Sequence, residues 1–345
     1  MCDAVTETYP QTPRPKGIAK NILEIDDPSV SAALKSATLI VDATTTLEAP
    51  RELSQRDDIC RTGSVFLTPS GRSCILLLED TARMTRLDSL EAQYYSAILE
   101  SAWGELHLMG HVGHMFVGGG CRDVTTTLSG EDVQLHAAIL GKQLRLLEGQ
   151  PNAQIRVWTA DSTSGAVVVT NVPVYPSTRT KHGRWKVIVH KGLETKLGAL
   201  RQEQLPSETG GVLLGYVDHQ LMAIYVVGAL DAPSDSQGDE TGFTRGVQGL
   251  QDRLENVANR TAHMAGYIGE WHSHPPFCAA TPSKDDRALL KTLAETLAND
   301  GNPAIMVIIG AAGDLTIEVQ DAITVAGSEG RDAGQALSGA RAEPT

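Results

Sequence analysis

Residues 269–275 read Gly269-Glu270-Trp271-His272-Ser273-His274-Pro275. The segment 267–272 is expected to form a β-strand, in which successive side chains point to opposite faces. His272 and His274 therefore project to the same side of the chain. Two imidazoles this close together can share one metal ion, and zinc is the usual choice when histidines and carboxylates are the ligands of a catalytic site.

Residues before and after this stretch are candidates for the other parts of a one-zinc hydrolase. Asp286 is a candidate third ligand, at the start of a helix that begins after Pro282. Three protein ligands leave a fourth position for water, whose pKa zinc lowers from roughly 15.7 to about 7. Glu208 is a candidate for taking the water's proton and passing it to the leaving amine. Ser283 is a candidate hydrogen-bond donor to the developing oxyanion.

Each of these residues also has a simpler interpretation. A His-x-His pair in a strand is often a surface or core feature, and Ser283-x-x-Asp286 matches a helix capping box. Glu208, before Thr-Gly-Gly, can be an ordinary loop residue. Glu270 is a competing base, or a partner that orients a histidine, because it shares its strand and face with His272. Two further residues nearby are expected to be bystanders: His263 and Cys278.

Three motifs make the C-terminal part of the chain more specific. They are Glu-Thr-Gly-Gly-Val-Leu-Leu-Gly from residue 208, Gly-Glu-Trp-His-Ser-His-Pro from residue 269 and Thr-Pro-Ser-x-x-Asp from residue 281. Together they resemble the bacterial branch of the JAMM (JAB/MPN, Mov34/MPN/PAD-1) zinc metalloprotease family over residues 184–322. The resemblance implies a cytidine-deaminase-like α/β/α domain with a mixed sheet. It also implies a zinc site made of His272, His274 and Asp286, with Glu208 as general base and Ser283 supporting the oxyanion.

One departure from the family pattern concerns the third zinc ligand. The loop from His274 to Ser283 is one residue longer than usual, which leaves Asp285 as an alternative to Asp286. The Ser-x-x-Asp spacing favours Asp286.

The N-terminal part shows a second resemblance. Segments 39–44 and 66–71, Gly120-Cys121-Arg122 and the helix expected after them resemble the later half of a ThiF-like ubiquitin-activating domain. The glycine-rich turn that would cradle ATP phosphates is absent, and Asp42-Ala43-Thr44-Thr45 lacks the acidic fourth residue that often holds Mg²⁺-ATP in that family. We therefore expect no adenylation by this chain alone. Cys121 is a candidate thioester cysteine, with a packed or idle thiol as the simpler alternative.

Hydropathy and turn residues divide this α/β chain into successive parts. We expect a flexible N-terminus over 1–20, a partial ThiF-like domain over 21–176, a linker over 177–184, a JAMM domain over 185–325 and a disordered tail over 326–345. The expected strands are 37–44, 74–79, 155–158, 166–169, 185–189, 211–216, 221–227, 267–272, 304–309 and 315–319. The expected helices are 87–99, 131–147, 193–201, 246–258 and 285–297.

Composition limits the class of protein and its partners. The chain has 345 residues, of which 41% are hydrophobic and 21% are charged, which is typical of a globular protein. The net charge of −13 argues against a nucleic-acid partner. Residues 1–15 do not resemble a signal peptide, and no apolar run is long enough to cross a membrane. The five scattered cysteines are expected to be reduced thiols in the cytoplasm.

The sequence therefore favours a zinc-dependent isopeptidase that acts at the C-terminus of a ubiquitin-like protein, for deconjugation or maturation. Its expected partners are that protein or its conjugate and the activating and conjugating enzymes of the same operon. The acidic segment 231–240 either selects a basic surface of the modifier or is an ordinary solvated loop. Alternatives are a metal-free scaffold or binding module, a zinc hydrolase of a small amino-acid conjugate and an activating enzyme. The intact ligand set argues against the scaffold, and the missing phosphate turn argues against the activating enzyme.

Overall fold

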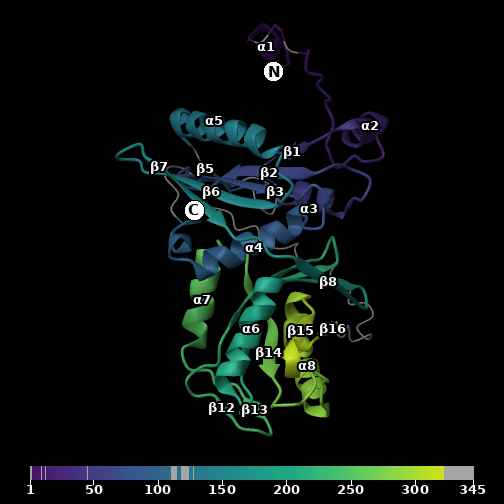
Figure 1. The fold of residues 1–345 in the computed structure, drawn as a ribbon, viewed down its shortest axis with the longest axis vertical. Helices are drawn as coiled ribbons and strands as arrows, with labels where there is room; N and C mark the ends of the chain where they lie inside the picture. The colour runs from purple at the N-terminus through teal and green to yellow at the C-terminus, as the bar shows by residue number, and fades with distance from the viewer. Residues whose placement is uncertain are drawn as a thin grey trace, which may run out of the picture.

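The computed structural model describes residues 2–8, 10–11, 13–44, 46–109, 115–117, 124–126 and 128–321. Two α/β halves lie one above the other, with helix α4 at their boundary (Figure 1). A five-stranded sheet forms the centre of the N-terminal half and a seven-stranded sheet the centre of the C-terminal half. The candidate thioester residue Cys121 and the expected tail over 326–345 lie outside the described residues.

The N-terminal sheet has the order β1-β2-β3-β6-β7. Only the β1–β2 pair is parallel, and the other pairs are antiparallel. Helix α5 packs on one face, where Leu140 and Leu147 belong to one hydrophobic cluster with Leu76 and Trp158. Helix α4 packs on the other face. The strands are β1 (Ile40–Asp42), β2 (Thr62–Leu67), β3 (Ser73–Leu78), β6 (Gln154–Ala160) and β7 (Val167–Val172), with a separate pair β4 (Met115–Val117) and β5 (Val124–Thr126). The helices are α1 (Cys2–Thr8), α2 (Pro28–Ser36), α3 (Glu48–Gln55), α4 (Leu87–Glu100), η1 (Ala102–Gly104) and α5 (Gly130–Leu147).

The C-terminal sheet has the order β16-β15-β14-β10-β11-β9-β8 and mixes parallel with antiparallel pairs. Helix α6 packs on one face, and α8 packs on the other through Leu290 and Ala294. The strands are β8 (Ser177–His182), β9 (Trp185–His190), β10 (Gly210–Asp218), β11 (Ala223–Leu230), β14 (Gly266–Ser273), β15 (Ala304–Ile309) and β16 (Leu315–Gln320), with a separate hairpin of β12 (Gln237–Gly238) and β13 (Phe243–Thr244). The helices are α6 (Lys191–Gln204), α7 (Leu250–Arg260), α8 (Lys284–Leu297), η2 (Ala298–Asp300) and η3 (Ala311–Gly313).

This architecture confirms the prediction of an α/β chain with a mixed sheet in its C-terminal part. The ThiF-like and cytidine-deaminase-like details stay predictions. Segment 1–20, expected to be flexible, contains the short helix α1. None of the helices in the described part of the chain has the length and the apolar character needed to span a bilayer.

The expected linker over 177–184 is wrong, because most of it forms strand β8. This strand pairs antiparallel with β9, from Ser177 opposite His190 to His182 opposite Trp185. Gly183, whose φ is 59°, begins the two-residue turn that joins the two strands. Strand β8 lies at the edge of its sheet, and its residues are exposed or half-buried. Polar residues are therefore tolerated in this strand, and their sequence resembles that of a linker.

The two halves share one hydrophobic core. Buried side chains of α4 and of the N-terminal sheet pack with Val212 and Tyr225 from the C-terminal sheet. At this boundary Asp88 of α4 accepts hydrogen bonds from the guanidinium of Arg179 and from the hydroxyl of Tyr225. The two halves are therefore packed as one folded unit.

Candidate metal centre

The predicted ligands meet where strand β14 ends and helix α8 begins. His272 and His274 stand two residues apart at the end of β14, and Asp286 lies in the first turn of α8. One ligand atom from each of the three residues lies within 4.8 Å of the others. Nε2 of His272 is 3.1 Å from Oδ1 of Asp286, and Nε2 of His274 is 3.8 Å from Oδ2.

Each histidine leaves Nε2 available to a metal. Nε2 of His272 is buried, and although it lies 3.1 Å from Oδ1 of Asp286, it makes no well-oriented hydrogen bond among the described residues. Leaving a buried polar atom in this state is costly, and a metal ligand would remove the cost. Nδ1 of His274 lies 2.7 Å from the carbonyl oxygen of Ala279. Because that oxygen can only accept, Nδ1 carries the proton and Nε2 keeps its lone pair for a metal.

Asp286 is held by a capping box at the start of α8. The backbone N–H of Asp286 donates to Oγ of Ser283 (3.1 Å), and the N–H of Ser283 donates to Oδ2 of Asp286 (2.6 Å). Burial raises the pKa of Asp286, but the neighbouring His272 and the Ser283 N–H outweigh it, so the pKa falls well below its usual range. The carboxylate is therefore ionised, as a metal ligand must be. The cluster contains Asp286, whereas the alternative ligand Asp285 is exposed.

The pairing of β10 with β14 brings Glu208 to the same place. Gly210 lies opposite His272, so the next residues along the antiparallel strands bring Glu208 towards His274. Thr209 and Ser273 lock this register, because the Ser273 N–H donates to the Thr209 carbonyl (2.7 Å) and the Thr209 N–H donates to the Ser273 hydroxyl (3.1 Å). Burial raises the pKa of Glu208 above its ordinary value.

One cavity of about 590 Å³ collects these groups. It is lined by both histidines, Asp286, Glu208 and Ser283, together with residues of the β12–β13 hairpin. The hairpin lies against the backbone of Glu208, whose N–H donates to the carbonyl of Asp239 (2.8 Å). The arrangement can hold a cation and places a second carboxylate in the same cavity.

The structure also separates the competing residues. Glu270 lines the same cavity, but Nε and Nη2 of Arg245 donate to one of its carboxylate oxygens at 3.1 and 2.8 Å. This ion pair makes Glu270 a poorer candidate for the base than Glu208. Cys278 is exposed, and His263 follows helix α7 with a φ of 62°. Neither belongs to the metal-binding cluster of the described residues.

Sequence reasoning missed Arg201, although the chain carried a signal for it. Leu193, Leu197 and Arg201 follow each other at intervals of four residues, so all three lie on one face of α6. All three are buried, and Arg201 is only 3% exposed. Because Arg201 continues the apolar stripe of Leu193 and Leu197, its spacing indicated an arginine buried against polar groups.

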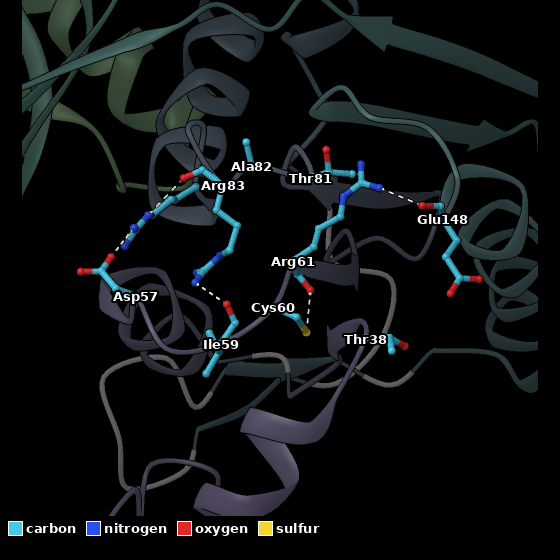
Figure 2. Close-up of a pocket in the computed structure, with 10 residues that line it drawn as sticks. Thr38, Asp57, Ile59, Cys60, Arg61, Thr81, Ala82, Arg83 and Glu148 are labelled. Atoms are coloured by element: carbon cyan, nitrogen blue, oxygen red, sulfur yellow. Dashed lines mark hydrogen bonds and ion pairs between the residues drawn. The ribbon is translucent and has the colours of Figure 1, made fainter.

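A second cavity, of about 460 Å³, lies in the N-terminal half. Figure 2 shows residues that line it. Its arginines bind groups of the protein itself. Nη1 of Arg83 donates to the carbonyl of Ile59 (3.2 Å), and Nη1 of Arg61 donates to the carbonyl of Glu148 (3.1 Å). Arg86 is paired with Asp57. This cavity lies in the N-terminal half, whereas the candidate metal ligands lie in the C-terminal half.

Comparisons with known proteins find relatives of part of this chain. Two curated relatives match: 34% identity over 104 residues to a CD-NTase/cGAS isopeptidase of Enterobacter hormaechei and 24% over 102 residues to the probable metalloprotease y4qB of Sinorhizobium fredii. Each match covers 30% of this chain, and the chain spans 56% and 62% of the length of those relatives. The solution structure of protein DSY2949 from Desulfitobacterium hafniense matches at 20% identity, over 37% of this chain and 79% of that one, with a TM-score of 0.24, too low to carry an argument.

The family comparison is the more specific one. Residues 190–321 match the model described as prokaryotic homologs of the JAB domain. This range contains Glu208, both histidines and Asp286, and it agrees with the resemblance that the three motifs indicated. Residues 190–321 of this chain are therefore similar to the prokaryotic homologs of the JAB domain.

Proposed function

We propose that this chain is a zinc-dependent isopeptidase or peptidase that acts at the C-terminus of a ubiquitin-like protein. The observation that carries the proposal is the gathering of His272, His274 and Asp286 in one cavity with Glu208. The names of the two relatives, an isopeptidase and a probable metalloprotease, support the same class of reaction.

The donor set fits zinc. Two imidazole nitrogens and one carboxylate oxygen form a common set of three protein ligands in catalytic zinc sites. The buried Nε2 of His272, which makes no well-oriented hydrogen bond, and the proton on Nδ1 of His274 support this assignment. When bound at these three residues, zinc would polarise the scissile carbonyl and lower the pKa of the attacking water.

The protein's own groups would carry the proton and stabilise the developing charge. Glu208 takes a proton from the attacking water and returns it to the leaving amine, and its raised pKa suits a group that must do both. The hydroxyl of Ser283 accepts the N–H of Asp286 in the capping box. Its own proton remains available to an oxyanion that forms in the cavity.

The substrate proposal rests on the family and on the geometry of extended tails. An extended C-terminal tail that enters the cavity lined by His274 would present its last peptide bond there. The ThiF-like resemblance of the N-terminal half makes that half a candidate surface for holding the same ubiquitin-like protein. The conjugate, and the activating and conjugating enzymes that make it, are the partners we propose.

Two measurements test this function. Metal content by mass spectrometry is expected to show about one zinc per wild-type chain and none in the His272→Ala/His274→Ala variant. Wild-type protein is then incubated with ubiquitin-like β-grasp proteins that carry a C-terminal peptide extension, beside small amino-acid conjugates. Cleavage after the terminal glycine of a folded modifier supports the proposal. Freshly purified, unchelated protein without metal would indicate a scaffold, and cleavage of the small conjugates alone would indicate a small-molecule hydrolase.

A further inference from the structure

Arg201 reaches from the buried face of α6 to the loop that carries the metal ligands. Its Nε donates to the carbonyl oxygen of His274 (2.9 Å), and its Nη2 donates to the carbonyl oxygen of Pro275 (2.9 Å). Nε and Nη2 form one edge of the planar guanidinium. Arg201 therefore binds two consecutive backbone carbonyls, and the first of them belongs to the candidate ligand His274.

Ion pairing does not explain why this arginine is buried. The ion pairs in the described part of the chain do not include Arg201, although its residue is only 3% exposed. Burying a guanidinium without a carboxylate is expensive, and carbonyl dipoles offset only part of that cost. A buried charge that lacks a counter-charge is expected where a functional site needs the charged group.

His274 is consequently held at three points. Its N–H donates to the carbonyl of Ile309 (2.9 Å), which ties it to β15. Its Nδ1 donates to Ala279 across the loop, and its carbonyl accepts from Arg201 on the α6 side. With backbone and ring both fixed, Nε2 is directed towards Asp286.

We propose that Arg201 is a positioning residue for the metal ligand His274, an inference that rests on the proposed metal site. Arg201 is not among the residues that line the cavity, and it acts by fixing the backbone from which the imidazole projects. Arginine suits this role better than lysine, because its rigid fork presents two donors to two acceptors, whereas an ammonium is a single point on a flexible stem. Groups that orient metal ligands typically contribute about 10- to 100-fold to metal affinity.

The test compares zinc affinity and coordination in full-length variants. Metal-free wild type, Arg201→Lys and Arg201→Met are titrated with Zn²⁺ against a chelating indicator, and each is also loaded with Co²⁺ for its visible absorption spectrum. Arg260→Met is the matched control, because Nη2 of Arg260 also donates to two carbonyls, those of Ile98 and Ser101, far from the ligands. Circular dichroism and the melting temperature verify folding.

We expect both Arg201 variants to bind Zn²⁺ about 10- to 100-fold more weakly and to show an altered Co²⁺ spectrum. Arg260→Met should lose stability but bind both metals as wild type does. If Arg201→Met fails to fold, Arg201→Lys, which keeps the charge and the stem, decides the question. Wild-type affinity and spectrum in a folded Arg201 variant would overturn the positioning role alone. A wild-type chain that binds no zinc would overturn both this role and the proposed function.

Discussion

Glu208 is the single residue on which the proposed chemistry depends most. Glu208→Gln keeps the size of the side chain but removes its ability to accept a proton. We expect the turnover number to fall by about 100- to 10,000-fold while the zinc content stays at the wild-type level, since Glu208 is not among the three clustered ligands. Steady-state cleavage kinetics and metal analysis measure the two quantities. The control is Glu203→Gln, an exposed residue of α6. Full activity in Glu208→Gln would move the base to another group, with Glu270 the first to test.

His107 gives the folded chain a dependence on pH that is separate from the metal site. Burial lowers the pKa of His107 to about 4, and its Nε2 lies 2.8 Å from the buried hydroxyl of Tyr94. An unfolded histidine has a pKa near 6.5. The neutral form is thus favoured by folding, so its contribution is complete above about pH 6.5 and is lost as the pH falls towards 4.

The expected loss is about 3 kcal/mol of unfolding free energy between these two pH values. His107→Phe removes the titrating group, and it should flatten this part of the stability curve even though it leaves the Tyr94 hydroxyl without its partner. Urea unfolding from pH 7 to pH 4 measures the slope. His219→Gln, at an exposed histidine, should keep the wild-type slope. An equally steep curve for His107→Phe would contradict the assignment.

At the scale of elements, the β12–β13 hairpin is the part that restrains Glu208 from outside the sheet. Gly238 packs so closely against the carbonyl oxygen of Glu208 that an added Cβ would overlap it. Gly242, in the same hairpin, has open space around its Cα. The two glycines therefore form a matched pair for testing whether the hairpin positions Glu208.

We expect Gly238→Ala to lower the turnover number by about 10- to 100-fold, because small displacements of a catalytic group are costly. Gly242→Ala should stay within about twofold of wild type, since its methyl meets no neighbouring atom. Steady-state kinetics with the same modifier fusion compares them. Equal activities would show that the hairpin does not position Glu208.

Elements with strong local patterns were predictable, and weakly patterned ones were not. Helix α5 was predicted from Leu140, Leu144 and Leu147, which repeat at helical spacing. The structure confirms it close to its expected bounds. Strand β3 is an unbroken run of buried residues and was equally clear. Strand β8 was missed, because as an edge strand its polarity matches that of a linker.

At the scale of the whole molecule, the boundary between the halves decides how the protein unfolds. Asp88 is fully buried, and its carboxylate accepts from Arg179, Tyr225 and Gln55. Asp88→Ala would remove the partner of the partly exposed Arg179 guanidinium and leave the buried Tyr225 hydroxyl without its acceptor, which costs about 1–3 kcal/mol. Because the core crosses the boundary, we expect wild type to unfold in one calorimetric transition and Asp88→Ala to shift that transition as a whole.

Differential scanning calorimetry, with hydrogen exchange on peptides from both sheets, checks this prediction. Asp231→Ala is the control, because its exposed ion pair with Arg253 should contribute at most about 1 kcal/mol. Two separate transitions, of which Asp88→Ala shifts only one, would show that the halves unfold independently.

The sequence by itself determined the class of the fold, the order of most elements and the candidates His272, His274, Asp286 and Glu208. These follow from local periodicity and from short motifs whose spacing limits where side chains can point. Ser283 was open between a helix cap and an oxyanion donor, and the capping box in the structure confirms the first of these while leaving the hydroxyl proton for the second.

Only the tertiary structure decided which distant groups touch. The register of β10 on β14 brings Glu208 towards His274. Arg201 donates a hydrogen bond to the carbonyl of His274, which lies 73 residues further along the chain. Asp88 accepts a hydrogen bond from Tyr225 across the boundary between the two halves. These contacts depend on the packing of elements far apart in the chain, and local patterns of hydropathy do not encode which elements pack together. The physical reason is that hydrophobic periodicity shows which face of a helix or strand is buried. Which other element packs against that face depends on the whole fold.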